Sequence, residues 1–78
     1  MRRIRFTFRD QLIKAPIIYE LGAQYHVVTN IRRADVQEGV GWVILELEGD
    51  EEDIERGLDW VRNQGVRVDP VLGDVVEG

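Results

Sequence analysis

Two neighbouring stretches set the architecture of this chain. They read Thr29-Asn30-Ile31-Arg32-Arg33-Ala34-Asp35-Val36 and Trp42-Val43-Ile44-Leu45-Glu46-Leu47. Both are rich in the β-branched and apolar residues that are typical of strands, and two glycines lie between them. We therefore predict a β-hairpin with strands at about 26–36 and 42–48, joined by a turn at 37–41.

Asn30 is unusual in the first of these strands, because asparagine is depleted in strand interiors. The apolar residues also change register, from odd positions up to Ile31 to even positions from Ala34. A β-bulge near Arg32-Arg33 explains this change, and bulges often re-aim side chains beside functional sites. The alternative that Asn30 only fixes local hairpin or edge geometry stays open.

The remaining elements follow from residue periodicity on either side of the hairpin. Residues 2–9 alternate between apolar and mostly basic side chains, which predicts a half-buried strand. Pro16 suits the first turn of a helix that carries apolar residues at helical spacing up to Tyr25. A second helix begins after Asp50 as N-cap and ends at Gly65, and a short strand follows, in which Pro70 favours an edge position.

The predicted order is thus βαββαβ. With right-handed crossovers it closes into an α+β, ferredoxin-like sandwich: a four-stranded antiparallel sheet of order 4-1-3-2 with two helices on one face. We predict a single domain over residues 1–72 and a loose tail over 73–78. In this sheet Arg3 and Arg5 should face Glu46 and Glu48 on the open face.

Trp42 and Ile44 share the parity of Glu46, so we expect them on the open face as well. A large aromatic side chain and an isoleucine on an open sheet face indicate a covered surface. The cover is a ligand, another subunit or the C-terminal tail.

Composition excludes several classes of function. The chain has no cysteine, which excludes disulfides, thiolate metal sites and iron–sulfur ligation. It has no apolar run of the roughly 20 residues that cross a bilayer, and its N-terminus lacks the pattern of a signal peptide. We expect a cytoplasmic protein without membrane insertion, cofactor or metal.

Charge is distributed unevenly along the chain. Residues 1–33 carry seven basic and two acidic side chains, whereas residues 34–78 carry three arginines and thirteen acids. This asymmetry is compatible with a nucleic-acid patch, but the expected pairing of the two halves across the sheet argues against it. RNA-recognition sheets also display several stacking aromatics, and Trp42 alone does not meet that requirement. We expect no nucleic-acid partner.

Catalytic and metal-binding patterns are weak. His26 is the sole histidine and has no nucleophile to activate, so we interpret it as a helix–strand junction residue. The acidic run from Glu46 to Glu55 lacks the ligand spacing of a calcium loop. We predict that the chain is not an enzyme.

Several of these residues resemble a known family, the NIL domain. The resemblance is carried by Asn30-Ile31, Ala34, Val36, Val43-Ile44-Leu45-Glu46-Leu47, Gly49-Asp50-Glu51-Glu52, Ile54, Leu58, Val66 and Pro16. The family is best known as the C-terminal regulatory domain of methionine-importer ABC ATPases. Its usual third motif residue is leucine, whereas this chain has Arg32, which makes a site there less apolar and more favourable to anions.

The resemblance implies pairing of such domains between subunits and, in the importers, methionine binding that inhibits transport. It also implies a transporter partner or, from relatives joined to iron–sulfur modules, a redox protein partner. If a ligand pocket exists, we expect Asn30 to orient the amino acid, Ile31 and Trp42 to offer apolar contact, and Arg32 or Arg33 to pair with a carboxylate.

We therefore expect a homodimeric domain that binds a small, methionine-like amino acid without catalysis. The alternative is a protein-interaction module that has kept the fold and lost the ligand.

Overall fold

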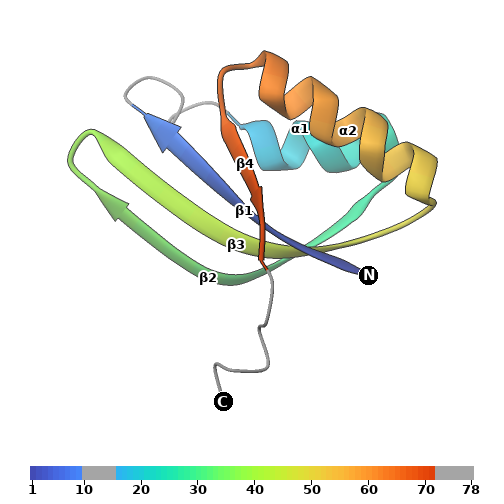
Figure 1. Ribbon diagram of the computed structural model, residues 1–78, viewed down its shortest axis with the longest axis horizontal. Coiled ribbons are helices and arrows are strands. Elements are labelled where there is room, and N and C mark those ends of the chain that lie inside the picture. Colours follow the sequence, from blue (N-terminus) through green and yellow to red (C-terminus); the bar gives the residue numbers. More distant parts are fainter. Residues whose placement is uncertain (10–15, 72–78) are drawn as a thin grey trace.

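The computed structural model describes residues 1–9 and 16–71. Its elements are β1 (Arg2–Arg9), α1 (Ile17–Tyr25), β2 (Val28–Gln37), β3 (Val40–Glu48), α2 (Glu51–Asn63) and β4 (Arg67–Pro70), as Figure 1 shows. The predicted βαββαβ order is confirmed. The predicted tail at 73–78 and the domain limit at residue 72 lie outside the described residues.

The four strands form one antiparallel sheet of order β2-β3-β1-β4, which confirms the expected α+β sandwich. Both helices cover the same face of the sheet (Figure 1), so the other face carries no helix. Strands β2 and β4 form the two edges, in agreement with the edge position expected from Pro70. Neither α1 nor α2 is long and apolar enough to cross a membrane.

The core lies between the two central strands and the helices. Phe6 of β1 stands opposite Val43 of β3, and Ile4 stands opposite Leu45. All four side chains are buried, and the alternation of Ile4 and Phe6 with polar residues along β1 predicts this for the first strand. From the helices, the core receives Ile17, Leu21, Ile54, Leu58 and Val61.

The two helices approach each other closely at Gly57 of α2. A Cβ atom at this position would lie 2.5 Å from Cδ1 of Leu21 in α1 and 3.4 Å from Cβ of Tyr25. Gly57 is buried, so α1 packs directly against the backbone of α2 at this point. Beside it, the rings of Tyr25 and Trp60 pack with centroids 6.0 Å apart. Glycine is therefore required at position 57 for the observed helix spacing.

Helix boundaries agree with the sequence signals in most respects. Asp50 is the N-cap of α2 and has extended backbone angles, but its side chain makes no capping hydrogen bond. Gly65 follows α2 with a φ of 95°, the left-handed conformation expected after a helix end. His26 is the C-cap of α1, which confirms it as a junction residue, and β2 begins two residues later, at Val28.

Two sequence-based predictions about the hairpin are wrong. The turn is shorter than 37–41, because Gln37 pairs with Val40 and only two residues, Glu38 and Gly39, lie between the strands. The predicted partner of Arg5 is wrong as well: because β1 and β3 are antiparallel, the opposition of Arg3 and Glu46 places Arg5 opposite Ile44 and not opposite Glu48. The opposition of Arg3 and Glu46 is confirmed.

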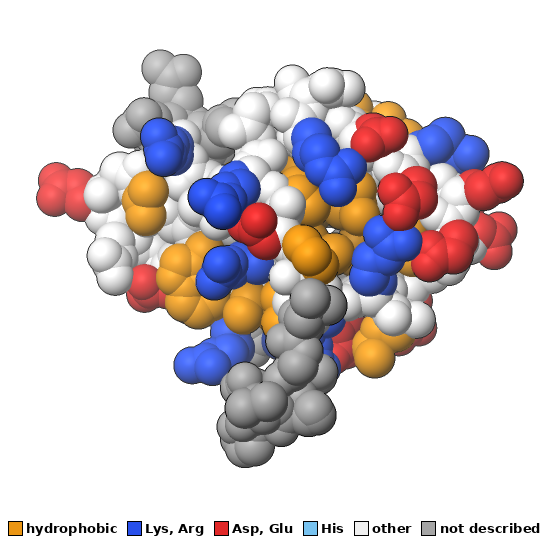
Figure 2. Space-filling view, viewed as in Figure 1, with side chains coloured by type: hydrophobic (Ala, Val, Ile, Leu, Met, Phe, Trp, Pro, Cys, Tyr) orange, Lys and Arg blue, Asp and Glu red, His pale blue; other side chains and the backbone are white. Residues whose placement is uncertain are grey.

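Arg2 ties the start of β1 to the first turns of α2. Its guanidinium lies 2.7 Å from a carboxylate oxygen of Glu51 and 2.7 Å from one of Glu55. The hydrogen bond that Arg2 donates to Glu55 is the main reason that the pKa of Arg2 is raised above its usual value, and the charge of Glu51 adds to it. Figure 2 shows acidic side chains gathered around the start of α2, toward the right of that view.

Candidate functional site

The edge strand β2 is the most exposed element of the sheet. Eight of its ten residues are exposed, and Thr29 and Asp35 are half-buried. The pairing of β2 with β3 shifts register between Ile31 and Arg33, so Arg32 is the extra residue of a β-bulge. The bulge expected from the change of apolar register is confirmed. Its free side presents backbone N–H and C=O groups that have no strand partner within the described residues.

A buried carboxylate anchors the bulge to the centre of the sheet. Glu46 of β3 is only 8% exposed and forms an ion pair with Arg3 of β1. The Nε atom of Arg32 lies 3.7 Å from the same carboxylate. Glu46 of β3 therefore contacts side chains of both neighbouring strands, β1 and β2.

Asn30 and Arg33 flank this cluster on the open face. Asn30 stands opposite Glu46, and Arg33 stands opposite Ile44. Both side chains are exposed. Arg33 has no ion pair with any described residue, so its guanidinium remains available to an anionic group. Asn30 provides both a donor and an acceptor at the same edge.

An apolar groove of about 270 Å³ runs along the other side of β2. Its walls come from β2, from the first turn of α1, and from the ends of β1 and β3. They consist of Phe8, Pro16, Ile17, Ile18, Tyr19, Ile31, Ala34, Val36, Gly41, Trp42 and Val43. Tyr19, Ile31 and Val36 are 75%, 59% and 67% exposed, so this groove holds much of the exposed apolar surface of the described chain.

The structure divides the five predicted site residues between the two faces. Asn30, Arg32 and Arg33 lie on the open face around Glu46. Ile31 stands opposite the buried Leu45, so it points to the helix side and into the groove. Trp42 is half-buried and lies on the open face, where it stands opposite Thr7 of β1 and Asp35 of β2. It also lines the groove. The free edge of β2 separates the two groups.

Sequence reasoning missed the contribution of α1 to the groove. Ile18 and Tyr19 occupy the first turn of α1, and Tyr19 lies outside its buried stripe. The feature that points to the groove is the pair of exposed apolar side chains, Tyr19 on α1 and Val36 on β2. Exposed apolar side chains that lie together mark binding surfaces. Among the described residues, no three His, Asp or Glu side chains lie close enough together to hold a metal ion.

Comparisons with known proteins agree on one family. The model of the NIL domain matches residues 2–70. The methionine import ATP-binding protein MetN of Lacticaseibacillus paracasei is 29% identical over 75 residues, which cover 91% of this chain and 21% of that protein. The chain thus spans about a fifth of the length of that relative.

A solved structure has the same fold. It is the C-terminal domain of an ABC transporter ATP-binding protein from Enterococcus faecalis, with a TM-score of 0.78 and 23% identity. The likeness covers 92% of this chain and 84% of that one.

Proposed function

This chain belongs to the NIL domain family, and we propose that it is a non-catalytic regulatory domain that binds a small, methionine-like amino acid at the edge of β2. The observation that carries the proposal is the arrangement around that edge. An apolar groove lies on one side, and polar and cationic side chains lie on the other. An amino acid with an apolar side chain has the same division between its two ends.

The groove suits the side chain of the ligand. Its lining contains no charged residue, and burial of apolar surface is the main source of affinity for such a group. An unbranched thioether adapts to irregular apolar surfaces, which favours methionine over branched amino acids. The two residues expected to offer apolar contact, Ile31 and Trp42, both line this groove.

The α-ammonium and α-carboxylate groups bind at the strand edge. The carboxamide of Asn30 accepts from the ammonium or donates to the carboxylate. Arg33 pairs with the carboxylate, because Arg32 is already held close to Glu46.

Replacement of Asn30 by alanine tests this arrangement. Calorimetry of the unaltered protein with L-methionine should give a binding isotherm, and saturation should raise the melting temperature, because a ligand that binds only the folded state stabilises it. Asn30→Ala should weaken binding about tenfold or more, since a charged ligand group loses its hydrogen-bond partner.

Asn63→Ala is the matched control, because it removes the same side chain at the end of α2, far along the chain from the groove. It should bind like the unaltered protein. An absence of heat with methionine and with every other amino acid would exclude the ligand site and leave the alternative, a protein-interaction module.

We also infer that two copies of the chain pair through β2 and the surface around Trp42 and Ile44. Exposed edge strands join other strands readily, and both of these side chains are half-buried on the open face of a single copy. We further infer that the physiological partner is a transporter or a redox protein in the cytoplasm. The similarity to a methionine import protein favours the transporter.

Trp42→Arg should abolish this pairing, because it places a cation in an apolar contact surface. Light scattering should give the mass of a dimer for the unaltered protein and that of a monomer for the variant. Trp60→Arg is the control, since Trp60 lies on α2 beside Tyr25 and away from the open face. A monomeric unaltered protein, or a variant that stays dimeric, would contradict the inferred interface.

A further inference from the structure

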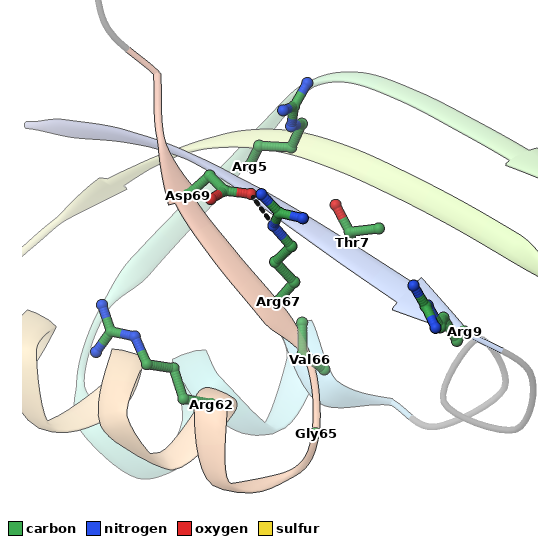
Figure 3. Close-up of a pocket in the computed structure, with 8 residues that line it drawn as sticks. All are labelled: Arg5, Thr7, Arg9, Arg62, Gly65, Val66, Arg67 and Asp69. Atoms are coloured by element: carbon green, nitrogen blue, oxygen red, sulfur yellow. Dashed lines mark hydrogen bonds and ion pairs between the residues drawn. The ribbon is translucent and has the colours of Figure 1, made fainter.

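A second cavity, distinct from the groove beside β2, lies at the opposite edge of the sheet. Its volume is about 490 Å³, and it forms where β4 begins. Figure 3 shows the residues that line it: Arg5, Thr7 and Arg9 from β1, Arg67 and Asp69 from β4, and Arg62, Gly65 and Val66 from the end of α2 and the turn that follows.

Strand length explains why a cavity is present here. β1 has eight residues and β4 has four, and the pairing of the two strands ends at Thr7 and Arg67. No described strand therefore pairs with Phe8 and Arg9 on the β4 side of β1. The side chain of Arg9 extends beside this part of the strand (Figure 3).

The charged residues that line this cavity are mostly basic, whereas the whole chain is acidic. Four arginines and one aspartate line it, in a chain whose net charge is −5. Arg67 is held by Asp69, with a hydrogen bond of 2.9 Å from its Nε atom (Figure 3), and Arg62 is held by Asp59 on its own helix. Arg5 and Arg9 have no ion pair with any described residue, although Arg5 stands opposite Asp69 in the pairing of β1 with β4. Four cations against one lining carboxylate leave an excess of positive charge, and an anion offsets it.

The spacing of these arginines favours an extended anion. Arg5 and Arg9 lie four residues apart on the same face of β1, which separates their Cα atoms by about 13 Å. Arg67 stands opposite Thr7, midway between them. Asp69 binds the Nε atom of Arg67, which leaves the two terminal nitrogens of that guanidinium to donate elsewhere. A chain of linked phosphates matches this extended row of cations along β1 and β4 better than a single phosphate group does.

We propose that this cavity binds the phosphate chain of a diphosphate or triphosphate compound. Arg5 and Arg9 contact its two ends, Arg67 contacts its middle, and the hydroxyl of Thr7 donates a further hydrogen bond. Arg67 is oriented by Asp69 before the ligand arrives, so little side-chain freedom is lost on binding. The site does not depend on the proposed binding of an amino acid at β2.

Calorimetry with pyrophosphate, ADP and adenosine at low salt tests the proposal. Pyrophosphate and ADP should bind, adenosine should not, and the affinity should fall as salt is added. ADP that binds much more tightly than pyrophosphate would identify a nucleotide as the source of the phosphate chain. Equal affinities would identify a free polyphosphate. The absence of binding by both phosphate compounds would overturn the proposal.

Arginine variants locate the site. Arg5→Gln and Arg67→Gln should each weaken pyrophosphate binding about tenfold, because each removes a charge-assisted hydrogen bond. Arg56→Gln is the matched control, since Arg56 is an exposed arginine of α2 that pairs with Asp53 and lies outside the cavity. An equal loss in all three variants would show general charge attraction and overturn the proposal. Asn30→Ala should leave pyrophosphate binding unchanged, so failure of one site is distinguishable from failure of the other.

Discussion

Replacement of Gly57 by valine is expected to lower the free energy of unfolding by about 3 kcal/mol, the largest effect we predict for a single helix position. The first added atom already meets Leu21 at 2.5 Å, and the two valine methyl groups have no space between the helices. Leu21 is fully buried, so it cannot turn away without leaving the core. The helices must therefore separate, and packing beneath Tyr25 is lost.

Thermal unfolding followed by circular dichroism measures this effect. For a domain of this size the expected loss corresponds to a fall in melting temperature of about 15 °C. Arg56→Val is the control, because it places the same β-branched side chain at the exposed neighbouring position, where the cost is that of helix propensity and of the surface ion pair with Asp53. If Gly57→Val melts at the same temperature as Arg56→Val, the close helix contact is not a determinant of stability.

The second large effect is expected from Glu46→Ala. This carboxylate is nearly buried and accepts charge-assisted contacts from Arg3 and Arg32. Its removal leaves two cations beside an apolar sheet centre without their shared anion, at a cost of about 2–3 kcal/mol. The contribution of Arg32 to this figure is the smaller one, because that side chain is more than half exposed.

The consequences of Glu46→Ala extend to the site. Without Glu46 the bulged Arg32 is no longer tied to β3, so we expect Asn30 to lose its fixed position and methionine to bind more weakly. Glu48→Ala is the control, because Glu48 lies two residues along the same strand and is exposed. Chemical denaturation should separate the two variants. Equal stability would show that the Glu46 cluster does not hold the bulge.

The sequence predicted the fold because its local signals agreed with each other. The alternation of Ile4 and Phe6 with arginines placed the first strand, and Gly65 marked the end of α2. The bulge was also predictable, since a one-residue insertion moves every later apolar side chain to the opposite parity. These signals depend on neighbouring residues alone, and tertiary packing did not overrule them.

The partners across the sheet were harder to predict. Two glycines in the hairpin permitted a five-residue turn, whereas the actual turn has two residues. In the separate pairing of β1 with β3, the antiparallel register that places Arg3 opposite Glu46 places Arg5 opposite Ile44. The candidate site raised a similar difficulty. Asn30 and Ile31 are neighbours in the chain, but neighbours in a strand point to opposite faces. The groove depends on where α1 packs, which periodicity does not specify.

The resulting account of the molecule centres on the free edge of β2. An apolar groove, an asparagine and an arginine meet along it, and the bulge with its buried glutamate fixes their arrangement. Membership in the NIL domain family does not by itself predict this arrangement, because this chain has Arg32 where the family motif usually has leucine. The carboxylate of Glu46 lies 3.7 Å from the Nε atom of Arg32 and so offsets part of the charge that this departure brings.

A nitrogen–proton correlation spectrum of the labelled protein, recorded during titration with L-methionine, tests the central claim most directly. We predict progressive shifts of the backbone amides of residues 30–36 and of the side-chain amide of Asn30, while Gly65 and Arg67 at the opposite edge stay unchanged. Shifts confined to α2 and β4, or a spectrum that does not change at any methionine concentration, would contradict binding at the edge of β2.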